Sequence, residues 1–249
     1  MSFFCYNNRC RCRRKRQNEW GENVPIVKKQ SLVDLIYEQL KQSIISLEFP
    51  MGSKINVNEL QEIYGVSTTP IREAINRLQR EGLILYENNV GARVITIDEN
   101  DAWEIDDLAM TLHKAAIRFA MERGDCDVIA EELQEHLIEQ QQATTAREVV
   151  ESIYRFIGTF YKYCGNSRLD FNMKLIQGQQ LMLRYMYRRE VGLNVRHLDI
   201  FSAIYQAVKR RDSETVVAQL QELSNRAMPV VLTALRREQA AGENGGIQK

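Results

Sequence analysis

The chain has 249 residues, and its 33 basic and 33 acidic side chains cancel, which argues against a protein that is basic over its whole surface. Its hydrophobic fraction of 44% and charged fraction of 27% are ordinary for a globular protein with room for two domains. No apolar run approaches the roughly 20 residues of a membrane helix, and no apolar segment follows the basic N-terminus as it would in a secretory signal. We therefore expect a cytoplasmic protein that does not contact a membrane.

The first predicted segment, residues 1–28, is a flexible arm rich in basic residues. Six Arg and Lys side chains fall within residues 9–16, and Cys5, Cys10 and Cys12 lie in or beside the same run. Metal binding by these cysteines is one interpretation, but they lack a fourth ligand nearby and the usual C-x2-C spacing. The other interpretation is a basic arm that adds affinity for phosphates. The odd total of five cysteines favours reduced thiols inside a cell.

Residues 29–98 read as a winged helix domain. Ser31 is a candidate N-cap for a helix that runs to about Leu47. Residues 57–82 then predict two helices joined by a Gly-Val-Ser turn, and the second helix has apolar residues at i, i+3, i+4 and i+7. The apolar runs at 83–86 and 93–97, separated by an Asn- and Gly-containing segment, predict a hairpin. A hairpin after such a helix is typical of a wing.

The polar face of the second helix predicts contacts with duplex DNA. Its N-terminal residues are the part of a helix-turn-helix that reaches base edges in the major groove. Alternatives remain for each residue type: an arginine can be a surface charge, a threonine can cap the helix, and a wing glycine can serve the turn. The candidate DNA-binding residues are Lys54, Ser67, Thr68, Thr69, Pro70, Arg72, Asn76, Gly91 and Arg93.

Residues 99–240 predict an all-helical domain that binds an effector and forms a dimer, and residues 241–249 predict a disordered tail. The expected helices cover 100–123, 125–143, 146–164, 167–187, 193–210 and 212–240. Short connections between such helices favour an antiparallel bundle, and a bundle of this size can hold a ligand cavity between its helices. The predicted fold class is therefore mainly α, with an N-terminal winged helix-turn-helix and a C-terminal antiparallel helical bundle.

Four side chains of the helical domain are candidates for ligand binding. Arg184 follows an apolar stretch, where an arginine could clamp a carboxylate or reach out to solvent. His197 could bind a ligand or be a core histidine, and Tyr154 and Tyr161 could line the same cavity or simply pack. We expect structural roles for His113 and His136. No catalytic motif, phosphate loop or metal-binding motif is present, which predicts a protein that is not an enzyme and holds no cofactor.

With these residues in view, the chain resembles GntR-type transcriptional regulators of the subfamily with an all-helical FCD effector domain. The resemblance covers residues 30–237. In the N-terminal part it rests on Gly52, Leu60, Gly65-Val66-Ser67, Thr69 to Ala74, Leu78, Glu81-Gly82-Leu83 and Gly91. In the C-terminal part it rests on Phe156, Phe160, Gly165-Asn166, Leu169, His197, Ala203-Ile204 and Asp212.

At two places the sequence departs from the family pattern, and each departure leads to a prediction. Many members hold a metal with one Asp and three His, and the resemblance puts Ile153, Ile157 and Leu223 in three of these places and leaves only His197. One imidazole does not hold a divalent ion, so we expect no metal in the effector domain. The family commonly has Arg at the place of Thr68, and threonine cannot make the bidentate contact to guanine. The operator preference should therefore differ.

The resemblance implies a repressor that binds operator DNA as a homodimer and responds to a small molecule, such as an organic acid or another metabolite. The alternative is a DNA-binding dimer whose helical domain is only a dimerisation scaffold without an effector. A cavity filled by Ile153, Ile157 and Leu223 would favour the scaffold, whereas an open pocket lined by Arg184 and His197 would favour the sensor.

Overall fold

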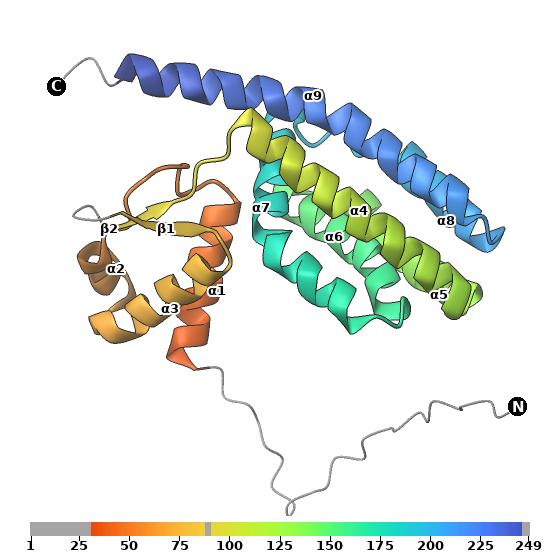
Figure 1. Cartoon of the computed structure of the whole chain (residues 1–249), viewed down its shortest axis with the longest axis horizontal. Helices are drawn as coiled ribbons and strands as arrows, with labels where there is room; N and C mark the ends of the chain where they lie inside the picture. Colours follow the sequence, from red (N-terminus) through yellow and green to blue (C-terminus); the bar gives the residue numbers. More distant parts are fainter. Residues whose placement is uncertain (1–30, 88–90, 246–249) are drawn as a thin grey trace, which may run out of the picture. The chain divides into compact units, whose positions relative to one another are not determined.

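A computed structural model describes residues 31–87 and 91–245, with side chains described as far as residue 239. The predicted basic arm and its three cysteines lie outside the described residues. The N-terminal elements are α1 (Leu32–Ile45), α2 (Val57–Tyr64), α3 (Thr68–Arg80), β1 (Ile84–Glu87) and β2 (Gly91–Val94). The later elements are α4 (Glu99–Arg123), α5 (Cys126–Gln142), α6 (Ala146–Tyr163), α7 (Ser167–Val191), α8 (Leu198–Lys209) and α9 (Ser213–Gly245), drawn in Figure 1.

The N-terminal elements form a winged helix. Asn56 caps α2 by accepting a bond from the backbone N–H of Asn58, and Gly65 ends that helix at a φ of 62°, in the left-handed region that suits glycine. The apolar face of α3 is fully buried, because Ile71, Ala74, Ile75 and Leu78 all have an exposed fraction of 0%. This inward stripe leaves the opposite face of α3 free, as the sequence pattern predicts.

The two strands pair antiparallel and make the wing. Ile84 lies opposite Val94 and Glu87 lies opposite Gly91, so the pairing extends over all four residues of each strand. Ile84 and Val94 point into the core, whereas Leu85 and Tyr86 are exposed. The wing therefore attaches to the domain through one apolar face and leaves the other to solvent or a partner.

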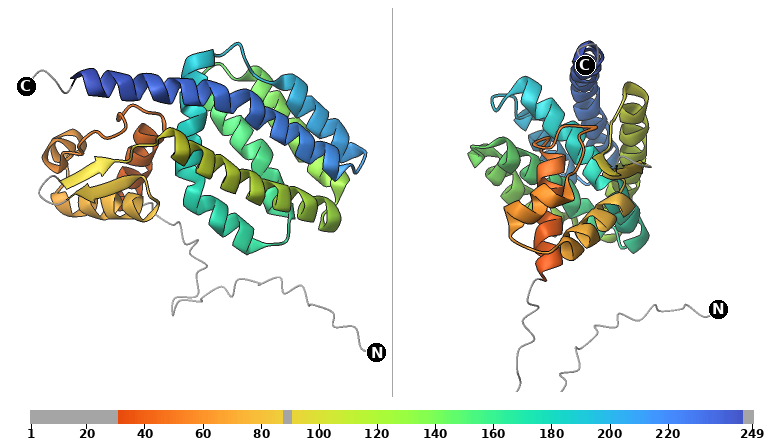
Figure 2. Two further views of the ribbon diagram at one scale, coloured as in Figure 1. Left: turned by 45° about the horizontal axis from the view of Figure 1, so that its top comes forward. Right: turned by 90° about the vertical axis from the view of Figure 1, so that its left-hand side faces the viewer.

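Helices α4 to α9 form an all-helical assembly in which α4 contacts α6, α7 and α9, while α5 contacts α6 and α8 (Figure 2). Two of the helices begin with a reciprocal capping box, formed by Asp98 with Asp101 at α4 and by Thr145 with Glu148 at α6. No helix in the described ranges is long and apolar enough to span a membrane.

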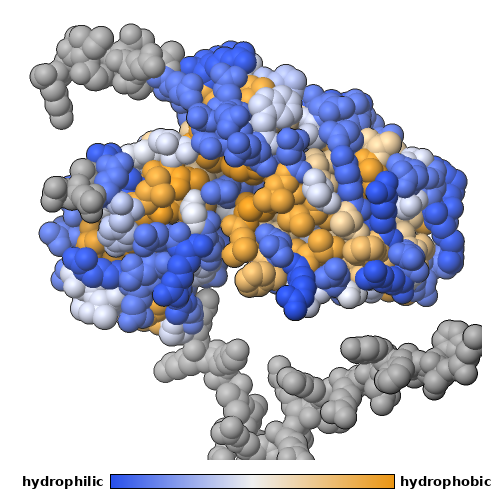
Figure 3. Space-filling view, viewed as in Figure 1, coloured by the Kyte–Doolittle hydropathy of each residue, from blue (hydrophilic) through white to orange (hydrophobic). Residues whose placement is uncertain are grey.

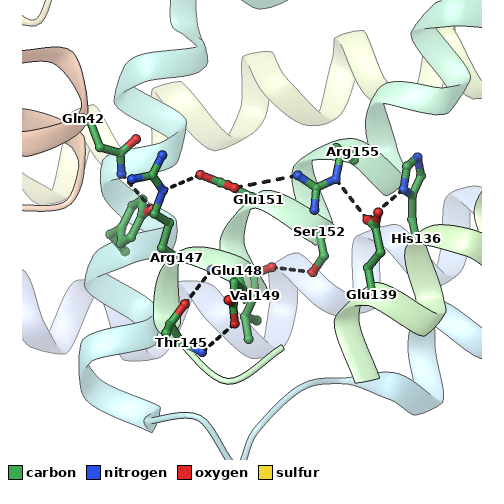
Figure 4. A network of polar contacts seen from close by, with 11 residues as sticks. Gln42, His136, Glu139, Thr145, Arg147, Glu148, Val149, Glu151, Ser152 and Arg155 are labelled. Carbon is green, nitrogen blue, oxygen red and sulfur yellow. Dashed lines mark hydrogen bonds and ion pairs between the residues drawn. The ribbon is translucent and has the colours of Figure 1, made fainter. Parts of the chain in front are cut away.

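An ion-pair chain runs along the outer face of α5 and α6 (Figure 4). Arg147 pairs with Glu151 at 2.6 Å, and Arg155 lies between Glu151 at 3.7 Å and Glu139 at 3.0 Å. His136 completes the chain, with Nδ1 at 3.1 Å from Glu139. Such partly exposed pairs contribute little to stability.

Three ends of the helices after residue 99 differ from the sequence prediction by four or five residues. Helix α7 continues to Val191 instead of 187, α8 begins at Leu198 instead of 193, and α9 continues to Gly245 instead of 240. The α7–α8 connection is held by distant backbone carbonyls, because Arg196 donates to Gln140 O at 3.0 Å and to Ala143 O at 2.7 Å. These bonds cap the end of α5 and hold residue 196 outside a helix, which no local sequence signal predicts.

Candidate functional site

The exposed face of α3 presents polar groups that have no partner in the described part of the chain. Arg72, Thr69 and Asn76 are exposed, and no ion pair or hydrogen bond of the Arg72 side chain occurs among the described residues. Ser67 caps α3 without a side-chain bond. By contrast, Arg77 on the same helix pairs with Asp34 at 2.6 Å. The free groups therefore gather near the N-terminal half of α3, whereas Thr68 and Pro70 are half-buried there.

The predicted DNA-binding residues of the wing have different structural roles. Gly91 has a φ of 98°, which favours glycine and agrees with a turn requirement. Arg93 donates from Nε to Glu87 at 3.1 Å and from Nη1 to Gly52 O at 2.8 Å, so it ties the wing to the loop before α2. Lys54 lies opposite Arg93 in an isolated bridge and is exposed. Of these cations, Lys54 is the freer one for a phosphate.

The helical domain contains a small cavity of about 100 Å³. Apolar side chains from α4, α6, α7 and α9 make most of its wall, including Met110, Ile153, Leu183, Leu220, Leu223 and Met228. Its polar lining residues are Asp106, His113, Gln180, Arg184, Tyr187, Arg188, His197 and Ser224. A concave space with a largely apolar wall into which polar groups converge is the usual form of a small-molecule site.

A large cavity of about 700 Å³ lies beside the small one, and three residues line both: His113, Gln180 and Arg184. The wall of the large cavity is more polar and comes from α6 and the first half of α7. It includes Tyr154, Ile157, Tyr161, Lys162, Asn166, Asp170 and Lys174. The three shared residues therefore mark the boundary between the two spaces.

Arg184 is the unpaired charge at this boundary. Its Nη1 is buried without a hydrogen-bond partner, and Arg184 makes no ion pair within the described ranges. Burial lowers the pKa of Arg184 to about 10, although Asp106 partly offsets this effect by favouring the charged form. A buried charge without a partner is costly in free energy, so the buried Nη1 of Arg184 favours binding of an anion.

His113 organises the polar groups of the boundary. Its Nδ1 lies 2.8 Å from Tyr161 Oη, and its Nε2 lies 3.0 Å from Gln180 Nε2. Burial and the charge of Arg184 lower the pKa of His113 to about 3, so the ring is neutral. Since the Gln180 amide donates to Nε2, Nδ1–H donates to Tyr161 and leaves the tyrosine hydroxyl hydrogen for another acceptor.

The four predicted ligand residues are distributed over the two cavities. Tyr154 and Tyr161 line the large cavity, His197 lines the small one, and Arg184 lines both. His197 Nε2 lies 2.6 Å from Tyr187 Oη. Its backbone is left-handed, with a φ of 52°, at the N-cap of α8. The predicted set therefore meets only through Arg184.

Sequence reasoning missed several polar residues of this region, among them Asp106, His113 and Ser224. The buried stripe of α4 carries a signal for His113, because Ala109, Ala116 and Ile117 lie three and four residues away on the same face. A histidine on such a stripe points inward with the apolar residues. Asp106 and Ser224 bond to each other at 2.5 Å across 118 positions, a pairing that only the fold reveals.

The positions that the resemblance links to metal binding do not share one cavity. Ile153, Leu223 and His197 line the small cavity, whereas Ile157 lines the large one. Among the described residues, no group of three or more His, Cys, Asp or Glu side chains is arranged to hold a metal. The polar residues of both cavities are instead hydrogen-bonding and charged groups, among them Arg184 with its unpartnered Nη1.

Comparisons with known proteins agree with the two-part architecture. Residues 32–94 match the family of bacterial regulatory proteins, gntR family, and residues 104–226 match the FCD domain. The Nta operon transcriptional regulator of Aminobacter aminovorans is 25% identical over 197 residues, which cover 77% of this chain and 92% of that protein. The HTH-type transcriptional repressor GlaR of Escherichia coli is 29% identical over 116 residues, 45% of this chain and 51% of that protein.

A solved structure shows the same fold. The protein described as E. coli McbR/YncC matches with a TM-score of 0.71 at 20% identity, over 82% of this chain and 98% of that chain. At this identity the likeness speaks for the fold alone. Together, the matched domains and the relatives show that the chain belongs to the GntR family of transcriptional regulators, with an FCD domain after its DNA-binding domain, and is not an enzyme.

Proposed function

We propose that this regulator is a homodimeric repressor whose affinity for operator DNA is controlled by a small organic acid bound at Arg184. The observation that carries this proposal is the unpaired guanidinium between two cavities of the helical domain. An anion that binds there gains a charge-assisted hydrogen bond and gives the buried Nη1 the partner that it lacks.

The free face of α3 supports the DNA-binding half of the proposal. Arg72, Thr69 and Asn76 are exposed, and Arg72 has no partner among the described side chains. We assign base or phosphate contact to Arg72, and backbone contact to Ser67, Asn76 and Lys54. Thr68 lies at the first position of α3, where it can bond only singly to a base edge, so it should change the operator preference.

The open cavities support a sensor over a mere dimerisation scaffold. Arg184 and His197 both line the small cavity, and Ile153 and Leu223 form part of its wall without closing it. Helix α7, which carries Arg184, also contacts the end of the DNA-binding unit. Gln179 donates to Gly82 O at 3.2 Å, only two residues after α3 ends. A ligand that favours one position of α7 would thereby favour one position of α3.

Exposed apolar side chains support the homodimer. Figure 3 shows apolar surface over α4 and α7, and large side chains there are well exposed: Trp103 at 46%, Leu108 at 46%, Phe171 at 61% and Leu175 at 45%. A contiguous apolar face of this kind is typical of a protein–protein interface. A two-fold dimer would present two copies of α3 to successive major grooves.

The experiment is an operator titration. A duplex selected from random DNA by the purified protein serves as the probe, and fluorescence anisotropy follows its binding with and without a panel of carboxylic acids. We expect at least one acid to change the apparent Kd of the wild type but not of Arg184→Met. Arg118→Met, an exposed change on the same domain, serves as the control and should keep the response. An acid response that survives in Arg184→Met would overturn the assignment.

A further inference from the structure

The small cavity contains two opposite charges that do not pair with each other. Asp106 on α4 and Arg184 on α7 both line its wall. Asp106 accepts a hydrogen bond from Ser224 Oγ at 2.5 Å, and no ion pair joins it to Arg184 in the described ranges. A carboxylate and a guanidinium that face one space without touching leave room for a ligand between them.

The electrostatics of the cavity favour a ligand with both signs of charge. Burial raises the pKa of Asp106, and the nearby Arg184 only partly opposes this shift. A simple carboxylate that reached Arg184 inside the small cavity would also approach Asp106 and be repelled by it. A ligand with a cationic group beside its carboxylate replaces this repulsion by a second attraction.

The second arginine of the cavity is held mainly by the backbone. Arg188 is buried, and its Nη1 donates to Gly192 O at 2.9 Å and to Val195 O, whereas its Nε is buried without a partner. The Nη1 bonds hold the guanidinium at the α7–α8 connection. His197, which is bonded to Tyr187, adds no charge because burial and Arg226 lower its pKa. Asp106 and Arg184 therefore remain the charged pair open to a ligand.

The size and wall of the cavity limit the rest of the ligand. An apolar cavity of about 150 Å³ accommodates benzene, so the 100 Å³ here limits the apolar group that it encloses to on the order of three or four carbons. The charged end of the ligand then lies at Arg184, which also lines the large cavity. The wall beside the two charges is aliphatic, with Leu183, Leu220 and Val231 among its members. A branched aliphatic group matches this space better than an aromatic ring or a second carboxylate.

From these observations we propose that the small cavity binds an α-amino acid with a short aliphatic side chain. Its carboxylate pairs with Arg184, its ammonium group pairs with Asp106, and its side chain lies against the aliphatic wall. This inference rests on the proposed function, because it names the class of organic acid that the sensor recognises. It adds Asp106 as the residue that selects amino acids over simple acids.

Matched ligand pairs test the inference by isothermal titration calorimetry of the full chain. L-valine is compared with 3-methylbutanoate, which lacks the amino group, and with 2-methylpropan-1-amine, which lacks the carboxylate. L-alanine and L-leucine bracket the side-chain size, and phenylacetate tests an aromatic acid. We expect valine to bind roughly tenfold to a hundredfold more tightly than either truncated ligand, because each loses a charge-assisted bond.

Two variants separate the roles of the charges. Asp106→Asn should reduce the preference for valine over 3-methylbutanoate to about threefold or less, whereas Arg184→Met should abolish binding of both. Asp107→Asn, an exposed neighbour on α4, is the matched control and should retain the wild-type preference. A melting curve of each variant verifies that it is folded.

The outcomes distinguish this inference from the function on which it rests. If 3-methylbutanoate or phenylacetate binds through Arg184 as tightly as valine does, the amino-acid inference is wrong and the organic-acid sensor stands. If Asp106→Asn retains the full preference for valine, the role of Asp106 is wrong. If no amino acid and no carboxylic acid of the panel binds the wild type, both the inference and the proposed sensor fail.

Discussion

Arg72 and Arg184 are both arginines without a hydrogen-bond or ion-pair partner among the described side chains, but their surroundings differ. Arg72 lies on the exposed face of α3, where water solvates its charge and an unpaired state costs little. Arg184 is half-buried, but its Nη1 is buried and has no partner, and there the same state is costly in free energy. An unpaired surface charge is therefore ordinary, whereas an unpaired buried charge points to something that binds it.

The largest effect on stability is expected at Arg184. We expect Arg184→Met to raise the free energy of unfolding by about 1–3 kcal/mol, since it removes a buried donor, Nη1, that has no hydrogen-bond partner. Urea denaturation of the two proteins without ligand measures the change. Arg118→Met, at an exposed pair with Glu214, should change stability by less than about 0.5 kcal/mol. A destabilised Arg184→Met would mean that Arg184 has a structural partner after all.

At the exposed Arg72 we expect a change in DNA binding and almost none in stability. Arg72→Ala should weaken binding of a selected duplex by about 1–3 kcal/mol while leaving the unfolding free energy within about 0.5 kcal/mol of the wild type. Anisotropy titrations and urea curves on the same samples test both parts. Arg118→Ala should leave DNA binding unchanged, and an Arg72→Ala protein that binds as tightly as the wild type would remove Arg72 from the interface.

The stability of the folded protein should also depend on pH through His113, at the boundary between the two cavities. His113 has a pKa of about 3 in the folded protein against 6.5 for an ordinary histidine, so the unfolded chain binds the extra proton first as the pH falls below 6.5. Stability should therefore decrease by about 2 kcal/mol for this group between pH 6.5 and pH 5. His113→Gln should lose this part of the slope, whereas His136→Gln should keep it. Equal slopes in wild type and His113→Gln would contradict a neutral buried ring.

The smallest effects are expected at two helical glycines, one of which packs against the DNA-binding domain. A Cβ at Gly178 on α7 would lie 2.8 Å from Leu83, so Gly178→Ala should lower stability by about 1 kcal/mol through overpacking. Gly158 on α6 has no such neighbour, and Gly158→Ala should raise stability by about 0.5–1 kcal/mol because glycine is unfavourable within a helix. Thermal melts compare the two. The same sign at both positions would argue against the α7 contact with Leu83.

The DNA-binding region could be predicted from local sequence patterns. The apolar spacing of α3 defines its buried face, and therefore also the free face that carries Arg72. The Asn and Gly residues between the two apolar runs are turn signals that predict a hairpin, and β1 and β2 pair as such a hairpin. These features depend on residues within a few positions of one another, so the sequence contains most of the necessary information.

The helical domain could be predicted only in outline. Its helices follow from periodicity and capping, but the start of α8 depends on Arg196, which bonds to carbonyls more than 50 positions earlier. The polar boundary likewise joins His113 on α4 to Tyr161 on α6 and Gln180 on α7. Interactions across such sequence separations arise from tertiary packing, which no local pattern encodes, so the two-cavity arrangement appears only in the fold.

The most direct test of the central claim is the melting temperature of wild type and Arg184→Met in the presence of a panel of carboxylic and amino acids. A ligand that binds only the folded state raises the melting temperature in proportion to its occupancy. Our account predicts that at least one acid stabilises the wild type and leaves the melting temperature of Arg184→Met unchanged. Equal stabilisation of both proteins, or none in either, would contradict an anion site at Arg184.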